Sequence, residues 1–332
     1  AGGTATTGVL VDIVETDVDL YYRIAVEMYR GIQENNAAGK TTVYICPVGP
    51  TFQYRRFVYL CRELPIDLSN VHIFFMDEYL APAPIAGAAG PAAPALIDID
   101  SPLSFRGFVR RELVEPLLEI DSDGAAAAQA DTPRAATPQA DARQAEGRLG
   151  LRAEQIHFPD PADPEAFDRL LGELGGADIC FAGVGINGHL AFNEPYDGGR
   201  ADNAPAAAGV TEPGAATAGA ATATVSGGAE FFNLGTRIVD LSRETITINS
   251  NTALGGAWEQ IPRRAITVGM KQILSSRSLR IFLNRPWQRA VVRKLLYGPV
   301  SASFPASAAQ EHVDARVTMT AEVAAPPQFA LR

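Results

Sequence analysis

The order of apolar segments constrains the fold of this chain more than any other feature of its sequence. Short apolar runs typical of strands alternate with segments whose apolar residues recur at helical spacing. Strands are expected at residues 9–14, 43–46, 71–76, 177–184, 236–241, 265–268, 280–283 and 317–321. Helices are expected at 17–36, from Thr51 to about Leu64, at 105–118, at 164–174, and from Gly269 and Pro286. This alternation predicts an α/β fold built on a mainly parallel sheet.

Three stretches interrupt the pattern, at about 81–96, 121–146 and 198–230. They are rich in Ala, Gly, Pro and Thr and have little hydrophobic periodicity. We therefore expect low-complexity surface insertions without regular structure, carried by a single domain of residues 1–332. The third stretch directly follows the richest motif of the chain, which makes it a candidate lid.

The charge balance limits the classes of partner. The chain has 28 Lys and Arg against 38 Asp and Glu, a formal net charge of −10 and a pI of about 5.0. This acidity argues against a nucleic-acid partner, because phosphate backbones select basic surfaces. An anionic substrate would need a local cationic pocket. No run approaches the roughly 18 apolar residues of a membrane helix, and the first residues lack a signal-peptide pattern, so we expect no membrane association and a cytoplasmic location.

The cysteines and histidines do not suggest a metal site. The three cysteines lie in apolar runs without metal-type spacing, and the four histidines are scattered along the chain. We expect Cys46, Cys61 and Cys180 to be buried, reduced thiols and expect no metal centre.

Three expected strands end in residues that could carry chemistry, and ligands collect at such ends in open α/β sheets. The first is the loop 47–51, which leads into a helix. Backbone N–H groups and the helix dipole would favour an anion such as phosphate there, so Gly49, Pro50 and Thr51 are candidate binding residues. A plain strand-to-helix turn explains the same residues equally well.

Asp77 and Glu78 follow the second of these strands. Adjacent strand residues point to opposite faces, so one carboxylate is expected to face a crevice while the other is solvated or paired. The carboxylate in the crevice would be a candidate general base. The alternative is a pair of acids that simply ends the strand.

The third strand end begins with Gly-Val-Gly-Ile-Asn-Gly at 183–188, which matches the G-x-G-x-x-G template of dinucleotide sites. We disfavour that interpretation, because the motif lies past mid-chain and no clear helix follows it. His189 and Glu194 come next. A carboxylate within reach of an imidazole orients and charges it, which suits proton transfer to a sugar oxygen. The alternative is a structural histidine.

Two of these motifs together resemble a known family. Asp-Glu-Tyr at 77–79 and Gly-His-Leu-Ala-Phe-Asn-Glu-Pro at 188–195 are similar to the paired signature of glucosamine-6-phosphate deaminases/isomerases, with further matches at 101–105, 236–241 and 265–269. The related 6-phosphogluconolactonases share a Gly-His motif but lack the Ala-Phe-Asn-Glu-Pro continuation. The resemblance implies a Rossmann-like, modified doubly wound sheet, a small-molecule sugar phosphate as partner, and no metal or nucleotide cofactor. It is compatible with a homo-oligomer.

The resemblance also implies roles for individual residues. Asp77 would be the base that moves a proton between C2 and C1 of the open-chain sugar through an enediol-type intermediate. His189 would help to open the pyranose ring with Glu194 as its partner, and Gly188 would belong to substrate binding. Asn187 stands where the family often has Asp. It can accept a hydrogen bond from His189 but supplies no charge, so the imidazolium would depend more on Glu194.

The expected phosphate site departs from the family pattern. The loop 47–51 reads Pro-Val-Gly-Pro-Thr instead of Thr-Gly-Gly-Thr-Pro, Asn251 replaces a phosphate-binding arginine, and the family's lysine falls near Gln288. We expect a replacement cation in the same pocket as Asp77 and His189. The candidates, in order, are Lys271 (at a helix start after an expected strand), Arg289, Arg285 and Arg55.

The resemblance implies an aldose–ketose isomerase/deaminase that converts an amino-sugar phosphate, most simply glucosamine 6-phosphate, to a ketose phosphate and ammonia. One alternative is a 6-phosphogluconolactonase-like hydrolase or a sugar-phosphate isomerase that does not deaminate. Another is a non-catalytic sugar-phosphate sensor. Regulators of that kind carry a helix-turn-helix, for which the stretch before Val9 leaves no room. Retention of Asp77, His189 and Glu194 favours catalysis.

Overall fold

The structure is a computed structural model that describes residues 8–64, 66–82, 93–120, 149–196 and 227–327. Most of the three expected insertions lies outside these residues. The end of the third does not, because α7 (Gly227–Phe232) is helical where no regular structure was expected.

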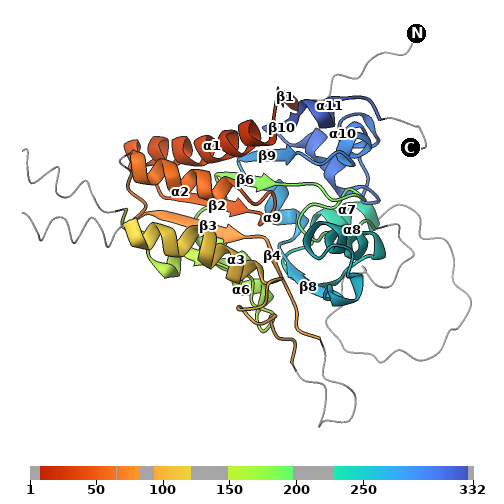
Figure 1. The fold of residues 1–332 in the computed structure, drawn as a ribbon, viewed down its shortest axis with the longest axis horizontal. Helices are drawn as coiled ribbons and strands as arrows, with labels where there is room; N and C mark the ends of the chain where they lie inside the picture. Colours follow the sequence, from red (N-terminus) through yellow and green to blue (C-terminus); the bar gives the residue numbers. More distant parts are fainter. Residues whose placement is uncertain (1–7, 65, 83–92, 121–148, 197–226, 328–332) are drawn as a thin grey trace, which may run out of the picture.

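A seven-stranded parallel sheet forms the centre of the molecule (Figure 1). Its strand order is β1-β10-β9-β6-β2-β3-β5, and every described pairing in it is parallel. The strands are β1 (Leu10–Val14), β2 (Thr42–Cys46), β3 (Val71–Phe75), β5 (Ile156–His157), β6 (Ile179–Ala182), β9 (Ser278–Leu283) and β10 (Ala315–Thr320). The predicted α/β fold with a mainly parallel sheet is therefore confirmed, and the ladder adds β5, which the sequence did not predict.

Helices cover both faces of this sheet, and the alternation of side chains along β2 shows why. Val43 and Ile45 belong to one apolar core, while Tyr44 and Cys46 belong to the other. A strand buried on both faces needs apolar residues at every position, as Thr42–Cys46 nearly provides. The result is the three-layer arrangement of a Rossmann-like, doubly wound protein.

The two helical layers differ in composition. On the Tyr44 face, α1 (Asp17–Ala37) and α2 (Gln53–Glu63) pack beside a helix made of α3 (Phe105–Val109) and the π-helical turn η1 (Arg110–Val114). On the Val43 face lie α6 (Pro164–Glu173), α7, α9 (Met270–Leu274), α10 (Gln288–Tyr297) and α11 (Ala321–Ala324). Local signals define the boundaries: Thr16 and Asp19 form a capping box at the start of α1, and Pro164 follows the Asp163 cap of α6.

A second, three-stranded antiparallel sheet branches from the first at Met76. It consists of β4 (Asp77–Tyr79), β8 (Arg264–Thr267) and β7 (Arg237–Asp240), in the order β4-β8-β7. Apolar residues from these strands pack with α8 (Arg243–Ala253) in a small separate core. The sequence predicted β7 and β8 but neither the strand that begins at Asp77 nor α8, which carries a weak apolar pattern of mostly polar residues.

Cys46, Cys61 and Cys180 are buried and unpaired, as predicted. In the described part of the chain, no helix has both the length and the apolar character needed to cross a membrane. The boundaries of a domain that spans residues 1–332 stay a prediction.

Candidate active site

A cavity of about 580 Å³ opens at the carboxyl ends of the parallel strands. Its walls come from the loop after β2, from β4, from the loop after β6, from α8 and from the loop after β9. Gly49, Pro50 and Thr51 line it together with Asp77 and His189. The structure thus brings residues from all three chemically distinctive strand ends into one cavity.

Asp77 and Glu78 point to opposite sides, as the strand period predicts. Asp77 lines the cavity and is 7% exposed. Burial first, and the neighbouring charge of Glu78 second, raise the pKa of Asp77 from its usual value to about 8. Among the described residues no hydrogen-bond donor contacts its carboxylate. A carboxyl group with this pKa can exchange a proton with a substrate near neutral pH.

Glu78 is fully buried and has a structural role. Its carboxylate accepts hydrogen bonds from the backbone N–H groups of Phe105 and Arg106 and from the Ser104 hydroxyl. These contacts satisfy free N–H groups at the start of α3, where a negative charge is favourable. Of the two acids, only Asp77 is therefore available for chemistry in the cavity.

His189 is held from behind by Asn187. The amide Nδ2 of Asn187 donates to Glu194 Oε2 at 2.7 Å and to Ser242 Oγ at 3.1 Å. Its carbonyl Oδ1 therefore faces His189, 2.8 Å from Nδ1 and 3.3 Å from the backbone N. An acceptor at Nδ1 keeps the imidazole proton on that nitrogen and leaves Nε2 as the proton acceptor. The predicted hydrogen bond from His189 to Asn187 is confirmed.

Glu194 supplies the negative charge of this network. It is 1% exposed, and its Oε1 accepts a hydrogen bond from the Ser242 backbone N at 3.0 Å. Burial acts to raise its pKa, but the attraction of His189 and hydrogen bonds from Thr245 and Asn187 outweigh burial and leave the pKa at about 2. Glu194 is thus ionised at neutral pH, 3.7 Å from His189 Nδ1.

Two members of the network were not predicted from the sequence. Ser242 caps α8, and Thr245 Oγ1 lies 3.2 Å from His189 Nδ1. The available signal was the Ser-Arg-Glu-Thr stretch at 242–245, which is typical of a helix start. It shows where a helix begins but not that this start lies against the histidine.

The turn around His189 requires two glycines. A Cβ on Gly185 would lie 2.0 Å from His189 Cε1, so only glycine lets the imidazole occupy this position. Gly188 has a φ of +92°, and the ring of Phe304 fills the space where its Cβ would be. Gly188 does not line the cavity, so the expectation that it contacts substrate is not supported. Asn187 and Glu194 also lie outside the lining, behind His189.

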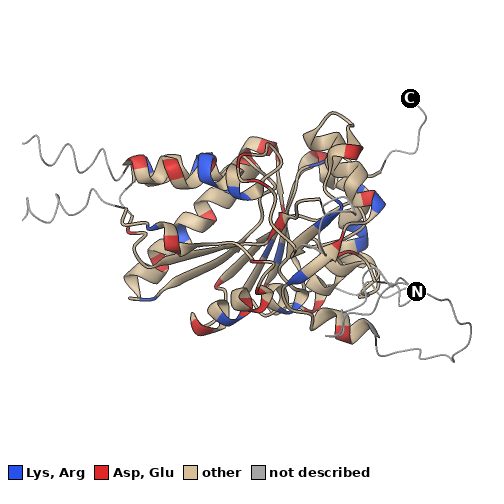
Figure 2. Ribbon diagram, turned by 90° about the horizontal axis from the view of Figure 1, so that it is seen from below, with Lys and Arg blue, Asp and Glu red and all other residues tan. Residues whose placement is uncertain are grey.

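The prediction that Lys271 supplies the replacement cation in this cavity is wrong. Met270 and Ile273 bury their side chains in the core on the Val43 face, so Lys271 between them is exposed and does not line the cavity. Arg289 is also directed elsewhere, with its Nε 2.9 Å from the Glu322 carbonyl oxygen. Arg55 forms a surface ion pair with Glu112. Figure 2 shows acidic and basic residues interspersed along the helices instead of gathered over one face.

Arg285 is the cation that the structure brings to the cavity. It lies among the lining residues in the loop between β9 and α10. Gln288 fixes this loop, because its Oε1 accepts hydrogen bonds from the backbone N–H groups of Asn284 and Arg285 while its Nε2 donates to the Val184 carbonyl oxygen. The position where the family lysine was expected thus holds a buried amide that orients the backbone of Arg285.

The first turn of α2 adds further donors. Phe52, at its N-cap, makes no side-chain capping hydrogen bond, and no acidic residue lies in the first turn. The preceding residues 47–52 all line the cavity. Free N–H groups and the positive end of an 11-residue helix near Arg285 make this end of the cavity suited to an anion. In the described residues, no group of three or more His, Cys, Asp or Glu side chains is placed to hold a metal ion.

Comparisons with known proteins agree with this picture. A glucosamine-6-phosphate deaminase of Rhodopirellula baltica is 30% identical over 172 residues, 50% of this chain and 55% of that protein. One from Porphyromonas gingivalis is 24% identical over 310 residues, 90% of this chain and 87% of that protein. Alignments with the relatives from Lachnoclostridium phytofermentans, Rhodopirellula baltica and Bacillus velezensis span only 55% to 59% of their length. No family model matches the chain.

Solved structures share the fold. A monomeric glucosamine-6-phosphate deaminase aligns with a TM-score of 0.64 at 21% identity, over 95% of this chain and 98% of that one. The 6-phosphogluconolactonase from Trypanosoma cruzi aligns with a TM-score of 0.56 at 12% identity, over 97% and 98%.

The α/β fold of this chain is therefore shared with both of these enzymes. The sequence relatives named above are all glucosamine-6-phosphate deaminases. The chain is similar in sequence to glucosamine-6-phosphate deaminases over half of its length or more, and it shares the fold of one whose structure is solved.

Proposed function

We propose that this protein is an aldose–ketose isomerase/deaminase that converts an amino-sugar phosphate, most simply glucosamine 6-phosphate, and water to a ketose phosphate and ammonia. The observation that carries the proposal is the presence in one cavity of a carboxyl group with a pKa of about 8 and an imidazole with a free Nε2. Such a pair provides one group for each of the two proton transfers that isomerisation of a cyclic amino sugar requires.

In this proposal, His189 acts on the sugar ring. Its Nε2 takes the proton of the C1 hydroxyl and returns it to the ring oxygen, so that the C1–ring oxygen bond breaks and C1 becomes an aldehyde. The ionised Glu194 stabilises the imidazolium that forms between these two transfers, and Asn187 keeps the ring oriented.

Asp77 would then move a proton from C2 to C1 of the open chain. Loss of the C2 proton, with transfer of one ammonium proton to the C1 oxygen, gives an enediol-type intermediate. Return of the carbon-bound proton to C1 then leaves a C1 hydroxyl and a protonated imine at C2. Addition of water to that carbon and departure of ammonia complete the ketose. The ammonium group of the bound substrate would favour the ionised form of Asp77, because an opposite charge nearby lowers a carboxyl pKa.

The phosphate would bind at the end of the cavity that is formed by residues 49–51 and Arg285. Free N–H groups at the start of α2 and one guanidinium would replace the arginine and lysine that the family resemblance led us to expect. Because this site differs from the family pattern, the identity of the sugar phosphate is the part of the proposal that most needs measurement. A cytoplasmic location stays a prediction.

The decisive experiment measures ammonia release from glucosamine 6-phosphate, galactosamine 6-phosphate and mannosamine 6-phosphate. Unphosphorylated glucosamine serves as the control for the anion site, and the Asp77→Asn variant serves as the control for contaminating activity. Ammonia from at least one phosphate, in equal amount to ketose phosphate, supports the proposal.

Two other results would contradict the proposed deaminase activity and indicate a different function. Hydrolysis of 6-phosphogluconolactone without ammonia release would indicate a lactonase, whose solved structures share this fold. Tight binding of a hexosamine phosphate without any turnover would indicate a sensor.

A further inference from the structure

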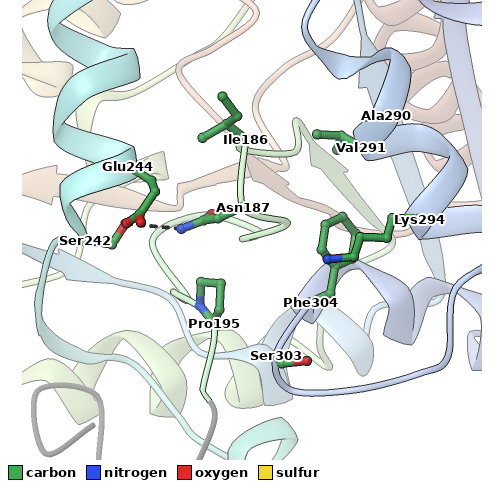
Figure 3. Close-up of a pocket in the computed structure, with 10 residues that line it drawn as sticks. All are labelled: Ile186, Asn187, Pro195, Ser242, Glu244, Ala290, Val291, Lys294, Ser303 and Phe304. Atoms are coloured by element: carbon green, nitrogen blue, oxygen red, sulfur yellow. Dashed lines mark hydrogen bonds between the residues drawn. The ribbon is translucent and has the colours of Figure 1, made fainter. Parts of the chain in front are cut away.

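A second cavity, of about 450 Å³, is lined in part by Ile186 and Asn187, from the loop that contains His189 (Figure 3). It shares no lining residue with the cavity that contains Asp77. Its walls come from the loop around Asn187, the start of α8, the helix α10 and the segment before the 3-10 helix η5 (Pro305–Glu311). Its volume lies within the range of small-molecule sites.

Opposite charges stand on opposite walls of this cavity. Among the described residues of its lining, Lys294 from α10 is the only base and Glu244 from α8 the only acid. Figure 3 shows them across the open space from each other. Within the described chain neither has an ion-pair partner. The ammonium of Lys294 lies over the Phe304 ring, 4.9 Å from its centroid, which restrains the charge at the rim.

The surface between the two charges is mixed in character. Ile186 and Val291 supply apolar contacts, and Ser242 supplies a hydroxyl. A ligand that matched this surface would have one charged group at each end and a short apolar connection between them.

The cavity touches the network behind His189 through Asn187. This side chain lies in the cavity wall, and its amide also holds Glu194 and Ser242. A ligand that displaced or polarised Asn187 would therefore alter the hydrogen bond that His189 Nδ1 makes with Asn187 Oδ1.

We propose that this second cavity binds a small zwitterion, with its anionic group at Lys294 and its ammonium group at Glu244, and that binding is transmitted through Asn187 to His189. The anion can be a carboxylate or a phosphate, since Lys294 pairs with either. The site is separate from the proposed reaction, so it can exist whether or not the chain is a deaminase.

Binding is measured by titration calorimetry on the full chain with two probes, 4-aminobutyrate for a carboxylate and phosphoethanolamine for a phosphate. Glycerol 3-phosphate and ethanolamine each lack one of the two charges. We expect at least one zwitterion to bind about tenfold more tightly than either control, which corresponds to one charged contact. Absence of measurable binding by both zwitterions, or equal binding of a singly charged control, overturns the proposal.

Variants then locate the bound zwitterion. Lys294→Met and Glu244→Gln should each weaken binding about tenfold. The matched variants Lys271→Met and Glu259→Gln change exposed residues outside both cavities and should bind like the unaltered protein. If Arg285→Gln abolishes binding while Lys294→Met leaves it intact, the probe occupies the first cavity and the proposal is wrong.

The link to His189 has its own readout. The chain has four histidines, so histidine-selective labelling gives a small set of imidazole NMR signals, of which His189→Gln identifies one. Saturation with the zwitterion should move the His189 signal and leave that of His312, whose Nε2 lies 2.9 Å from the Ser276 carbonyl oxygen, in place. An unmoved His189 signal at saturation contradicts transmission through Asn187.

Discussion

The imidazole of His189 approaches the carboxylate of Glu194 no closer than a charge contact, with Nδ1 3.7 Å from Oε2. The amide of Asn187 lies between them and bonds to both. The neutral Asn187 therefore connects His189 to the charge of Glu194 through hydrogen bonds. The family that the sequence resembles often has an aspartate, and so a charge, at position 187 itself. This arrangement makes the three residues interdependent.

The first prediction follows from that interdependence. His189→Ala and Glu194→Ala should each reduce kcat severely, and the double variant should be about as impaired as the worse single one, because residues that act as a unit are not additive. Steady-state kinetics of the four proteins test this. Multiplication of the two separate defects in the double variant would show that they act independently.

The second prediction concerns Asp77 as the base. Asp77→Asn keeps the size of the side chain but cannot accept the C2 proton, so kcat should fall by roughly 10²–10⁴-fold. Substrate affinity, measured by calorimetry, should change little. Exchange of the C2 proton with deuterated water gives a second readout, and near-normal exchange in the variant would remove Asp77 from this role.

The third prediction is a pH dependence. In the free protein the pKa of Asp77 is about 8, and a base acts only when it is deprotonated. The value of kcat/KM, which reports groups of the free enzyme, should therefore rise as the pH increases and level off above about 8. A rate that is flat between pH 6 and pH 9 would contradict the raised pKa or the role of Asp77.

The fourth prediction concerns the anion site. Arg285→Gln removes the cation in the described lining of the cavity, so KM for a sugar phosphate should rise roughly 10–100-fold with a smaller effect on kcat. Arg289→Gln is the matched control, because Arg289 contacts Glu322 instead. Equal effects of the two variants would show that Arg285 does not hold the phosphate.

Local sequence rules were sufficient for those features of the fold and the site that depend on a single strand or helix. The two-residue period of a strand was enough to separate Asp77 from Glu78, and alternation of strands and helices was enough for the main sheet. Lys271 was misplaced because its position at a helix start says nothing about the face of the sheet on which the helix packs. Met270 and Ile273 decide that by burial, and they turn Lys271 to solvent.

Other features depend on contacts between segments that are distant in sequence. Glu194 meets the Ser242 backbone N, and Thr245 reaches His189, across about fifty residues of chain in each case, since 48 and 56 positions separate the partners. The strand at Asp77 exists only because β8, nearly 200 positions later, pairs with it. No local pattern encodes such pairings.

The small antiparallel sheet carries Asp77 and contacts the loop of His189. Asp77 pairs with Thr267 in this sheet, and the Thr267 hydroxyl accepts a hydrogen bond from the Phe192 backbone N in the loop of His189. Asp77 therefore lies on a strand of the small sheet, and the loop of His189, which follows β6 of the large sheet, is tied to that small sheet by this hydrogen bond. Residues 49–51 and Arg285 instead follow β2 and β9 of the large sheet. A lineage with this plan could exchange the tail that its substrate carries by rebuilding the loops after β2 and β9, while the contact between Thr267 and the His189 loop kept Asp77 and His189 at a constant spacing.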